Sequence, residues 1–182
     1  MAKMIFMNLP VADVAKATAF YEAIGFEKNP QFSNEQASCM VWSDAIHVML
    51  LDHGFYRTFT TKEIADTHKT SAALIAVSRD SRAEVDAITD AAIAAGGRQT
   101  RATEDGGFMY ARPFEDLDGH IFEPIYMDMA AFPAAMTDQH EGAEGETAPR
   151  APGADHRRRD PDEVTVLVLG GEHEQLEPRP ED

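Results

Sequence analysis

Glu123 is the residue whose type and setting point most directly to chemistry. It lies inside the largely apolar run His120–Met127, with an isoleucine two positions away on each side. Side chains alternate between the two faces of a strand, so those isoleucines share its face. A carboxylate on a buried strand is costly unless it is paired, coordinated or protonated. Glu123 therefore either makes a structural hydrogen bond, to Asn8, Tyr21 or backbone groups, or has a functional role.

A second group of candidates consists of aromatic and cationic side chains on the predicted strands and the central connector. Tyr110 and Arg112 share a face of one strand, and together they could anchor an anionic or polar ligand. Four aromatic residues either wall a cleft and stack on an aromatic ligand or belong to the core or a dimer interface: Trp42, Phe55, Tyr56 and Phe59. The paired glycines 96–97 and 106–107 indicate a helix end and a turn rather than a phosphate-binding loop.

The elements that must position these residues can be read from the spacing of apolar residues. Along the first part of the chain, the spacing typical of a strand alternates with the spacing typical of a helix. Asp13 is a helix N-cap, and Gly25 supplies the left-handed residue that ends the helix. Around this helix the pattern predicts strands over Met4–Leu9, Glu27–Phe32, Ala37–Ser43 and Ile46–Leu51. A connector over Phe55–Lys69 follows, with a short helix predicted at Thr61–His68.

The same order then repeats. A strand over Ala72–Ser78 leads to the capping box that opens at Ser81, and the helix runs to Ala95. Three more strands are predicted over Arg98–Thr103, Phe108–Phe114 and His120–Met127. Corresponding points lie about 68 residues apart, which indicates an internal duplication. The predicted fold is α+β: two tandem βαβββ modules forming a curved mixed, mostly antiparallel sheet around a cleft.

Charge and composition predict a boundary after this domain. Residues 1–133 form the domain, and residues 134–182 form an acidic tail rich in proline and glycine that we expect to be mostly disordered. Half of the net charge of −16 falls on residues 137–182. Within the tail, Val164–Leu169 is β-prone and apolar, and it either adds to a sheet edge or is an exposed adhesive segment.

Composition also narrows the partners and the compartment. An excess of acidic residues argues against nucleic acid and anionic membrane surfaces, because phosphate binding needs concentrated lysine and arginine. No apolar stretch is long enough to span a bilayer, and no secretory signal is evident. Cys39 is the single cysteine, so no internal disulfide can form, which fits a cytoplasmic protein.

The duplicated βαβββ pattern resembles the vicinal-oxygen-chelate superfamily, which includes glyoxalase I, bleomycin-resistance proteins and extradiol dioxygenases. Residues 8–13 and 20–26 (NLPVAD and FYEAIGF) resemble its first strand and helix end, and residues 114–123 (FEDLDGHIFE) resemble its closing hairpin. Residues 61–66 and 107–110 resemble a bacterial branch labelled predicted lactoylglutathione lyase. The likeness covers about residues 4–133 and implies a fold that hosts isomerases, dioxygenases and pure binders.

The resemblance also implies four positions for the ligands of a divalent metal, on the first and fourth strands of each module. In this chain they fall on Phe6, Met49, Ala72 and Glu123. Phenylalanine, methionine and alanine give no useful ligand for the hard or borderline ions that such sites hold. Three of the four expected ligands are therefore missing, so we predict no cofactor and keep a divalent metal as the alternative.

An alternative ligand set would use neighbours of the matched positions. Asn8 shares a face with Phe6, and His47 shares a face with Met49, so both could point into the cleft beside Glu123. If a metal binds, His47 and Glu123 are the expected ligands. The glutamate equivalent to Glu123 serves as general base or metal ligand in the superfamily's isomerases. A structural hydrogen bond is the expectation for His120, which lies next to a turn.

Two functions follow from the resemblance. The first is a glyoxalase/bleomycin-resistance-like protein that binds a small molecule in the cleft without the usual metal, using Asn8, His47, Tyr110, Arg112 and Trp42. The second is a metal-dependent lyase or isomerase of the lactoylglutathione lyase type, or a dioxygenase, with a non-standard ligand set and Glu123 as the proton-transferring residue. A homodimer is expected by analogy with the superfamily.

Overall fold

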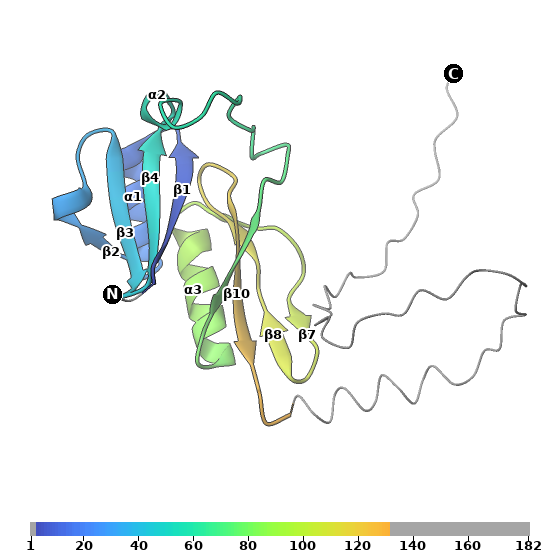
Figure 1. The fold of residues 1–182 in the computed structure, drawn as a ribbon. Helices are drawn as coiled ribbons and strands as arrows, with labels where there is room; N and C mark the ends of the chain where they lie inside the picture. Colours follow the sequence, from blue (N-terminus) through green and yellow to red (C-terminus); the bar gives the residue numbers. More distant parts are fainter. Residues whose placement is uncertain (1–2, 132–182) are drawn as a thin grey trace, which may run out of the picture. The chain divides into compact units, whose positions relative to one another are not determined.

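The first module places one helix against one face of a four-stranded sheet (Figure 1). A computed structural model describes residues 3–131; the predicted boundary at residue 133 and the tail, including Val164–Leu169, lie outside the described residues. The strands occur in the order β1-β4-β3-β2, with β1 parallel to β4 and the other pairs antiparallel. The elements are β1 (Ile5–Val11), α1 (Val14–Ala23), β2 (Glu27–Asn29), the 3₁₀ helix η1 (Pro30–Phe32), β3 (Ala37–Ser43) and β4 (Ile46–Asp52).

The helix signals in the first module are confirmed. The side chain of Asp13 accepts hydrogen bonds from the amides of Ala15 and Lys16, so it satisfies two of the donors that the first turn leaves free. Gly25 has a φ of 96°, the left-handed conformation that a side chain would disfavour. The buried face of α1 includes Phe20 and Tyr21.

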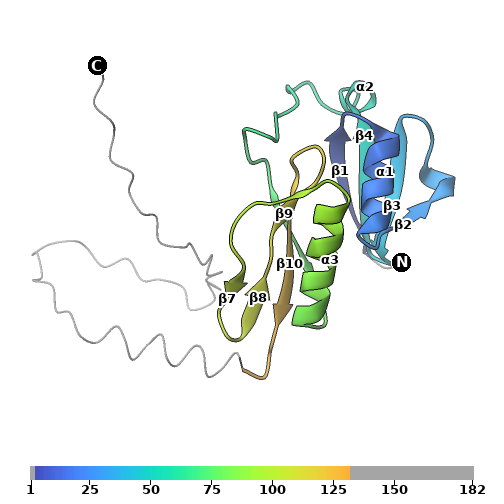
Figure 2. The same cartoon turned by 180° about the vertical axis from the view of Figure 1, so that it is seen from behind.

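The second module repeats this plan with shorter strands (Figure 2). Here β5 pairs with β10 in parallel, as β1 pairs with β4, and the remaining described pairs are antiparallel. The side chain of Ser81 caps α3 by accepting from the amide of Glu84. The elements are β5 (Leu74–Ser78), α3 (Arg82–Ala94), β6 (Arg98–Gln99), β7 (Glu104–Asp105), β8 (Met109–Ala111), β9 (Phe114–Glu115) and β10 (Ile121–Met127).

One hydrophobic core joins the two modules. Phe20 and Tyr21 of α1 belong to the same buried cluster as Ile88 of α3, together with strand residues from both sheets. Phe122 of β10 packs edge-on against Tyr21, with ring centroids 5.7 Å apart. Because the helices and the core occupy one face of each sheet, the opposite faces carry no helix. The predicted α+β fold of two βαβββ modules is confirmed.

Two sequence predictions about local structure are wrong. The strand predicted over Glu27–Phe32 ends at Asn29, whose side chain accepts from the amide of Gln31 and caps η1. Residues 61–68 form turns and bends rather than a helix. The short helix lies earlier, in α2 (His53–Tyr56), because Asp52 caps it by accepting from the amide of Phe55 at 2.7 Å.

The last strands are also shorter than the periodicity predicts. Arg98–Thr103 retains only the two residues of β6, and Phe108–Phe114 is divided between β8 and β9. Arg112 and Pro113 stand at that division, and proline has no amide hydrogen to continue a ladder. The last predicted strand, His120–Met127, is confirmed as β10 over Ile121–Met127.

Candidate functional site

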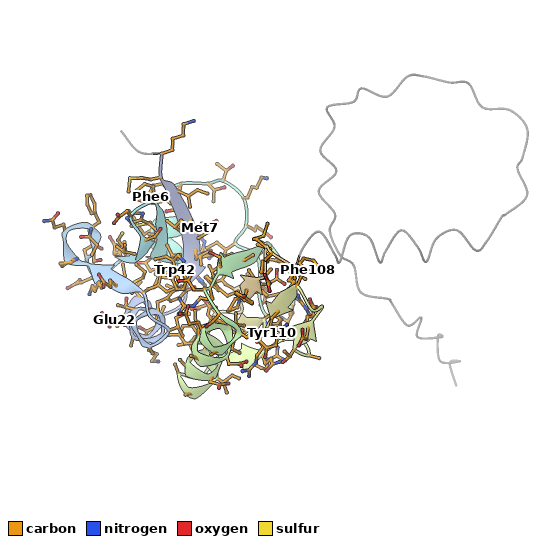
Figure 3. The ribbon with its side chains drawn as sticks, turned by 90° about the horizontal axis from the view of Figure 1, so that it is seen from below. Phe6, Met7, Glu22, Trp42, Phe108 and Tyr110 are labelled. Atoms are coloured by element: carbon orange, nitrogen blue, oxygen red, sulfur yellow. The ribbon has the colours of Figure 1, made fainter. Side chains whose placement is uncertain are left out.

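The helix-free face of the first sheet carries a cavity of about 530 Å³. The pairing of three strands brings the lining residues together. Phe6 of β1 lies opposite His47 of β4, and Met49 of β4 lies between Asn8 of β1 and Cys39 of β3. Figure 3 looks along these strands and shows Phe6 on the side away from Glu22 of α1. The cavity is lined by Met4, Phe6, Asn8, Asn29, Phe32, Cys39, His47 and Met49.

His47 is the polar group of this cavity with the least exposure. The residue is 8% exposed, and its Nδ1 atom is buried without a hydrogen-bond partner. The ring stacks on Phe6, with centroids 4.8 Å apart and an interplanar angle of 24°. Buried polar atoms are normally paired, so an unpaired imidazole nitrogen calls for an explanation. Asn8 and His47 line the same cavity, as the alternation of side chains along the two strands predicts.

Glu123 lies on the second sheet, where it is adjacent to Ala76 of β5 and does not line the cavity of His47. Its carboxylate accepts from Arg101 Nη1 at 2.5 Å, and Arg101 Nε donates to Glu104 at 2.6 Å. The two carboxylates, that of Glu104 first, raise the pKa of the Arg101 guanidinium. The partner of Glu123 is thus Arg101 rather than Asn8 or Tyr21. Sequence reasoning placed Arg101 in the strand predicted over Arg98–Thr103 and missed its role, because β6 ends at Gln99 and Arg101 lies beyond it.

The closing hairpin binds the two modules together through Asp116. Its carboxylate accepts from the Tyr21 hydroxyl at 2.7 Å and from the amides of His120 and Asp118 at 2.8 and 2.9 Å. Burial raises the pKa of Asp116, and burial together with Asp116 raises that of Tyr21. His120 makes the expected structural hydrogen bond, with Nε2 2.8 Å from the Pro10 carbonyl oxygen.

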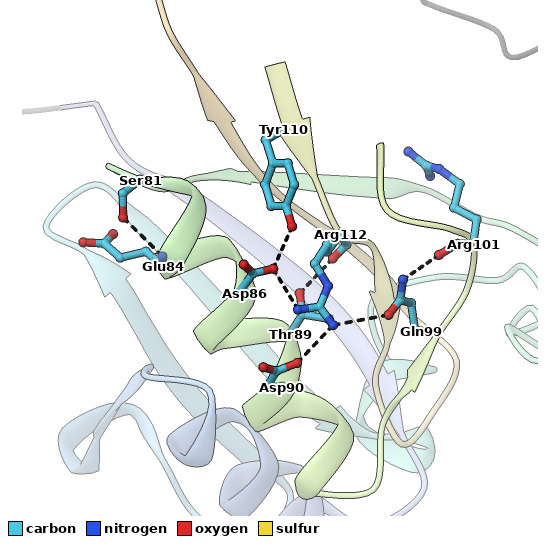
Figure 4. Close-up of polar contacts among 9 residues, drawn as sticks. All are labelled: Ser81, Glu84, Asp86, Thr89, Asp90, Gln99, Arg101, Tyr110 and Arg112. Carbon is cyan, nitrogen blue, oxygen red and sulfur yellow. Dashed lines mark hydrogen bonds and ion pairs between the residues drawn. The ribbon is translucent and has the colours of Figure 1, made fainter. Parts of the chain in front are cut away.

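Tyr110 and Arg112 share a face, but that face is covered by α3 (Figure 4). The Tyr110 hydroxyl donates to Asp86 Oδ1 at 2.8 Å, and Arg112 donates to Asp86 at 2.8 Å and to Asp90 at 3.0 Å. Arg112 lowers the pKa of the Asp86 carboxyl. The expectation that this pair anchors a ligand in the cleft needs correction, because aspartates of the chain itself already occupy its donors.

Trp42 also lies on the core side of its sheet, as do Met40 and Phe26. Its ring centroid is 4.7 Å from that of Phe26, and the Arg79 guanidinium lies 5.1 Å from the Trp42 ring. The expectation that Trp42 contacts a ligand in the cleft is therefore corrected to a packing role. Alternation along β3 already separates Trp42 from Cys39, which lines the cavity.

A second cavity, of about 310 Å³, lies beside the connector between the modules. It shares Asn8 with the first cavity and includes Tyr56, Ile75 and Ile121. Ala72 lines this cavity and precedes β5. Leu74 is the strand residue that lies 68 positions after Phe6, so the second module has an aliphatic residue at the corresponding place.

The superfamily's divalent metal does not fit the residues at the matched positions. Phe6 and Met49 offer an aromatic ring and a thioether, and the Glu123 carboxylate is paired with Arg101. Within residues 3–131 no cluster contains three or more histidine, cysteine, aspartate or glutamate side chains placed to hold a metal. In the same range, no helix is long and apolar enough to cross a membrane.

The arrangement of the two βαβββ modules gives this chain the vicinal-oxygen-chelate fold. Residues 3–42 match the family described as bleomycin resistance protein-like N-terminal. No curated protein matches the sequence.

Three solved structures illustrate the likeness. A hypothetical protein, SA1046, from S. aureus is 23% identical and has a TM-score of 0.59, over 69% of this chain and 94% of its own. A glyoxalase/bleomycin resistance protein/dioxygenase family enzyme from Burkholderia phytofirmans is 18% identical, with a TM-score of 0.60 over 69% and 99%. The fosfomycin resistance protein FosX from Mesorhizobium loti is 17% identical, with a TM-score of 0.54 over 73% and 98%.

Proposed function

We propose that this protein binds a small molecule in the cavity of the first sheet and does so without the divalent metal of superfamily enzymes. The observation that carries the proposal is the cavity itself: about 530 Å³, on a face without a helix, and lined by residues of which none is an acid, a lysine or an arginine. Its volume lies in the usual range for small-molecule sites, which are mostly apolar with a few polar anchors. The match of residues 3–42 to the bleomycin resistance protein-like family supports binding.

The proposal is tested by following the methionine methyl groups by NMR while the protein is titrated with a library of small aromatic compounds. Met4 and Met49 line the cavity, whereas Met127 is exposed on β10 and serves as an internal control. Compounds that bind should shift the methyl signals of Met4 and Met49 and leave that of Met127 in place. Binding that shifts Met127 alone, or a library without any binder, contradicts the proposal.

A second candidate is a metal-dependent lyase, isomerase or dioxygenase with a non-standard ligand set. The observation that favours it is the presence of Asn8 and His47 in one cavity, with a carboxylate, Glu123, on the other sheet. In this candidate Glu123 would have to leave Arg101 to act as a general base or ligand.

Elemental analysis separates the two candidates. The untagged wild-type protein and Glu123→Gln are purified in the presence of Mg²⁺, Mn²⁺, Ni²⁺ and Zn²⁺, and the metal content per chain is measured. We expect well under one metal per chain in both proteins. About one metal per wild-type chain, lost in Glu123→Gln, would establish the second candidate and sink the metal-free proposal.

We propose further that the protein acts in the cytoplasm as a homodimer, with neither nucleic acid nor membrane as a partner. The free thiol of Cys39 supports a reducing compartment. Exposed apolar side chains on strands outside the cavity of the first sheet, Ile5 and Leu74 among them, support self-association. Sedimentation equilibrium should give twice the chain mass of 20.0 kDa. A single species of chain mass at micromolar concentration would contradict the dimer.

A further inference from the structure

The unpaired nitrogen of His47 narrows the chemistry of the cavity's ligand. Leaving a buried donor or acceptor without a partner costs the free energy of its lost hydration. The Nδ1 atom of His47 is in that condition, and the residue as a whole is only 8% exposed. A ligand group that reaches this nitrogen recovers the lost interaction, so the site favours a ligand with a matching polar group.

The surroundings of His47 set the charge and shape of that ligand. The cavity lining contains no lysine, arginine, aspartate or glutamate, so it offers no counter-ion to a charged group. Phe6 and Phe32 line the cavity and are 53% and 66% exposed, so each presents ring surface to a ligand. Planar rings gain from stacking on such surface.

We infer that the ligand is a neutral, planar aromatic compound whose hydroxyl group hydrogen-bonds to His47, an inference that rests on the proposed function. A hydroxyl fits better than an amine or a carbonyl, because a hydroxyl both donates and accepts. It therefore pairs with Nδ1 in either tautomer of a neutral imidazole. His47 is then the residue that sets specificity, and the apolar lining provides affinity without discrimination.

Access to the nitrogen requires a side chain to move. The His47 ring is covered by its neighbours, and Phe6 stacks on it at 4.8 Å. Phe6 is more than half exposed, so little packing holds its ring in place. A hydrogen bond to Nδ1 lies in the plane of the imidazole, so movement of the Phe6 ring lets a planar ligand bring its hydroxyl to the edge of the His47 ring while its own ring packs on the phenylalanines of the cavity.

Three matched probes test the inference by isothermal titration: naphthalene, 2-naphthol and the anion 2-naphthoate. In a cavity without a polar partner the hydroxyl loses its water and gains nothing, so naphthalene binds more tightly. With His47 as partner, 2-naphthol should bind about tenfold more tightly than naphthalene, and 2-naphthoate should bind least. In His47→Phe the preference for 2-naphthol should vanish while naphthalene still binds, and His47→Gln should restore part of it.

The outcomes distinguish this inference from the proposed function. Equal binding of naphthalene and 2-naphthol to the wild-type protein, or a preference that survives in His47→Phe, overturns the hydroxyl inference and leaves the proposed cavity in place. Tightest binding of 2-naphthoate overturns it as well. Failure of all three probes to bind the wild-type protein counts against both. The wild-type comparison stands even if His47→Phe does not fold, which thermal unfolding will reveal.

Discussion

At the scale of single residues, two carboxylates show how differently this chain compensates a buried acid. Asp116 accepts hydrogen bonds from a hydroxyl and two amides, which are neutral donors. Glu123 is held by a cation, because Arg101 donates to it at 2.5 Å. Hydrogen bonds from neutral donors only partly offset the loss of water around Asp116, whereas a guanidinium supplies a full opposite charge to Glu123.

The buried carboxyl of Asp116 should make stability fall with rising pH. Its pKa in the folded chain is raised by burial, so above the ordinary aspartate range the unfolded chain has lost a proton that the folded chain retains. Raising the pH then favours unfolding. The free energy of unfolding of the wild-type protein, measured in urea, should fall relative to that of Asp116→Asn as the pH rises through and above the ordinary aspartate range of about pH 4. A constant difference across this range would show that Asp116 titrates normally.

The pair of Arg101 and Glu123 should contribute more than a comparable surface pair. The Glu123 side chain is 17% exposed and that of Arg101 is 41% exposed, so solvent screens part of the attraction. Arg101→Gln should lower the free energy of unfolding, measured in urea, by about 1 kcal/mol at pH 7.

Arg98→Gln is the matched control for Arg101→Gln. Arg98 also pairs with a largely buried glutamate, Glu115, but its own side chain is 72% exposed. Urea denaturation should show the smaller loss for Arg98→Gln. Equal losses in the two variants, or no coupling in a double-mutant cycle of Arg101→Gln with Glu123→Gln, would assign the effect to packing of the arginine stem.

At the scale of elements, the turn before β10 is shaped by the connector that lies against it. Gly119 has a φ of 85°, and a Cβ there would come within 2.7 Å of the Thr67 backbone. The Thr67 hydroxyl donates to the Asp118 carbonyl oxygen in the same turn. The connector therefore needs a residue without a side chain at this point.

Gly119→Ala should be markedly more destabilising than Gly107→Ala. Gly107 has a similar φ of 78°, but a Cβ added there meets nothing within 4 Å. Gly107→Ala thus measures backbone strain alone, about 1 kcal/mol, whereas Gly119→Ala adds displacement of the connector. Urea denaturation of both variants gives the comparison, and limited proteolysis should show faster cleavage near Thr67 in Gly119→Ala only. Equal losses would mean that the connector yields without cost.

Elements with strong local signals were predictable from the sequence. Asp13 and Ser81 cap the helices as their side-chain chemistry indicates, and the 68-residue repeat identifies the duplicated module. The short helix was misplaced because its signal, Asp52 as N-cap, lies at the end of a strand. Alternation predicted that Tyr110 and Arg112 share a face, but which face meets α3 depends on tertiary packing.

The candidate site was likewise predictable from the sequence only in part. Asn8 and His47 line one cavity because β1 and β4 pair without a break from Ile5 to Val11. The alternation of side chains between the two faces therefore holds along both strands. The role of Arg101 was missed because the strand predicted over Arg98–Thr103 ends at Gln99, and alternation does not constrain a residue beyond that end. The bond between Tyr21 and Asp116 joins positions 95 residues apart, and only the packing of the two modules brings them together.

At the scale of the whole domain, the two modules share a core that neither could complete alone. Phe122 of the second module is 1% exposed, and its ring faces Tyr21 and Phe26 of the first module at 5.7 and 6.4 Å. Loss of one module would expose these aromatic rings of the other. Modules that bury each other's side chains in this way should unfold as one cooperative unit.

Phe122→Leu tests this cooperativity, because the chain has a single tryptophan, Trp42, in β3 of the first module. Removing part of a buried ring should lower the free energy of unfolding by about 1–2 kcal/mol. Fluorescence of Trp42 reports the first module, and far-UV circular dichroism reports both. If the modules unfold together, Phe122→Leu shifts the two urea midpoints equally, although the substitution lies in the second module. A Trp42 midpoint that stays in place while the dichroism midpoint falls would mean that each module unfolds by itself.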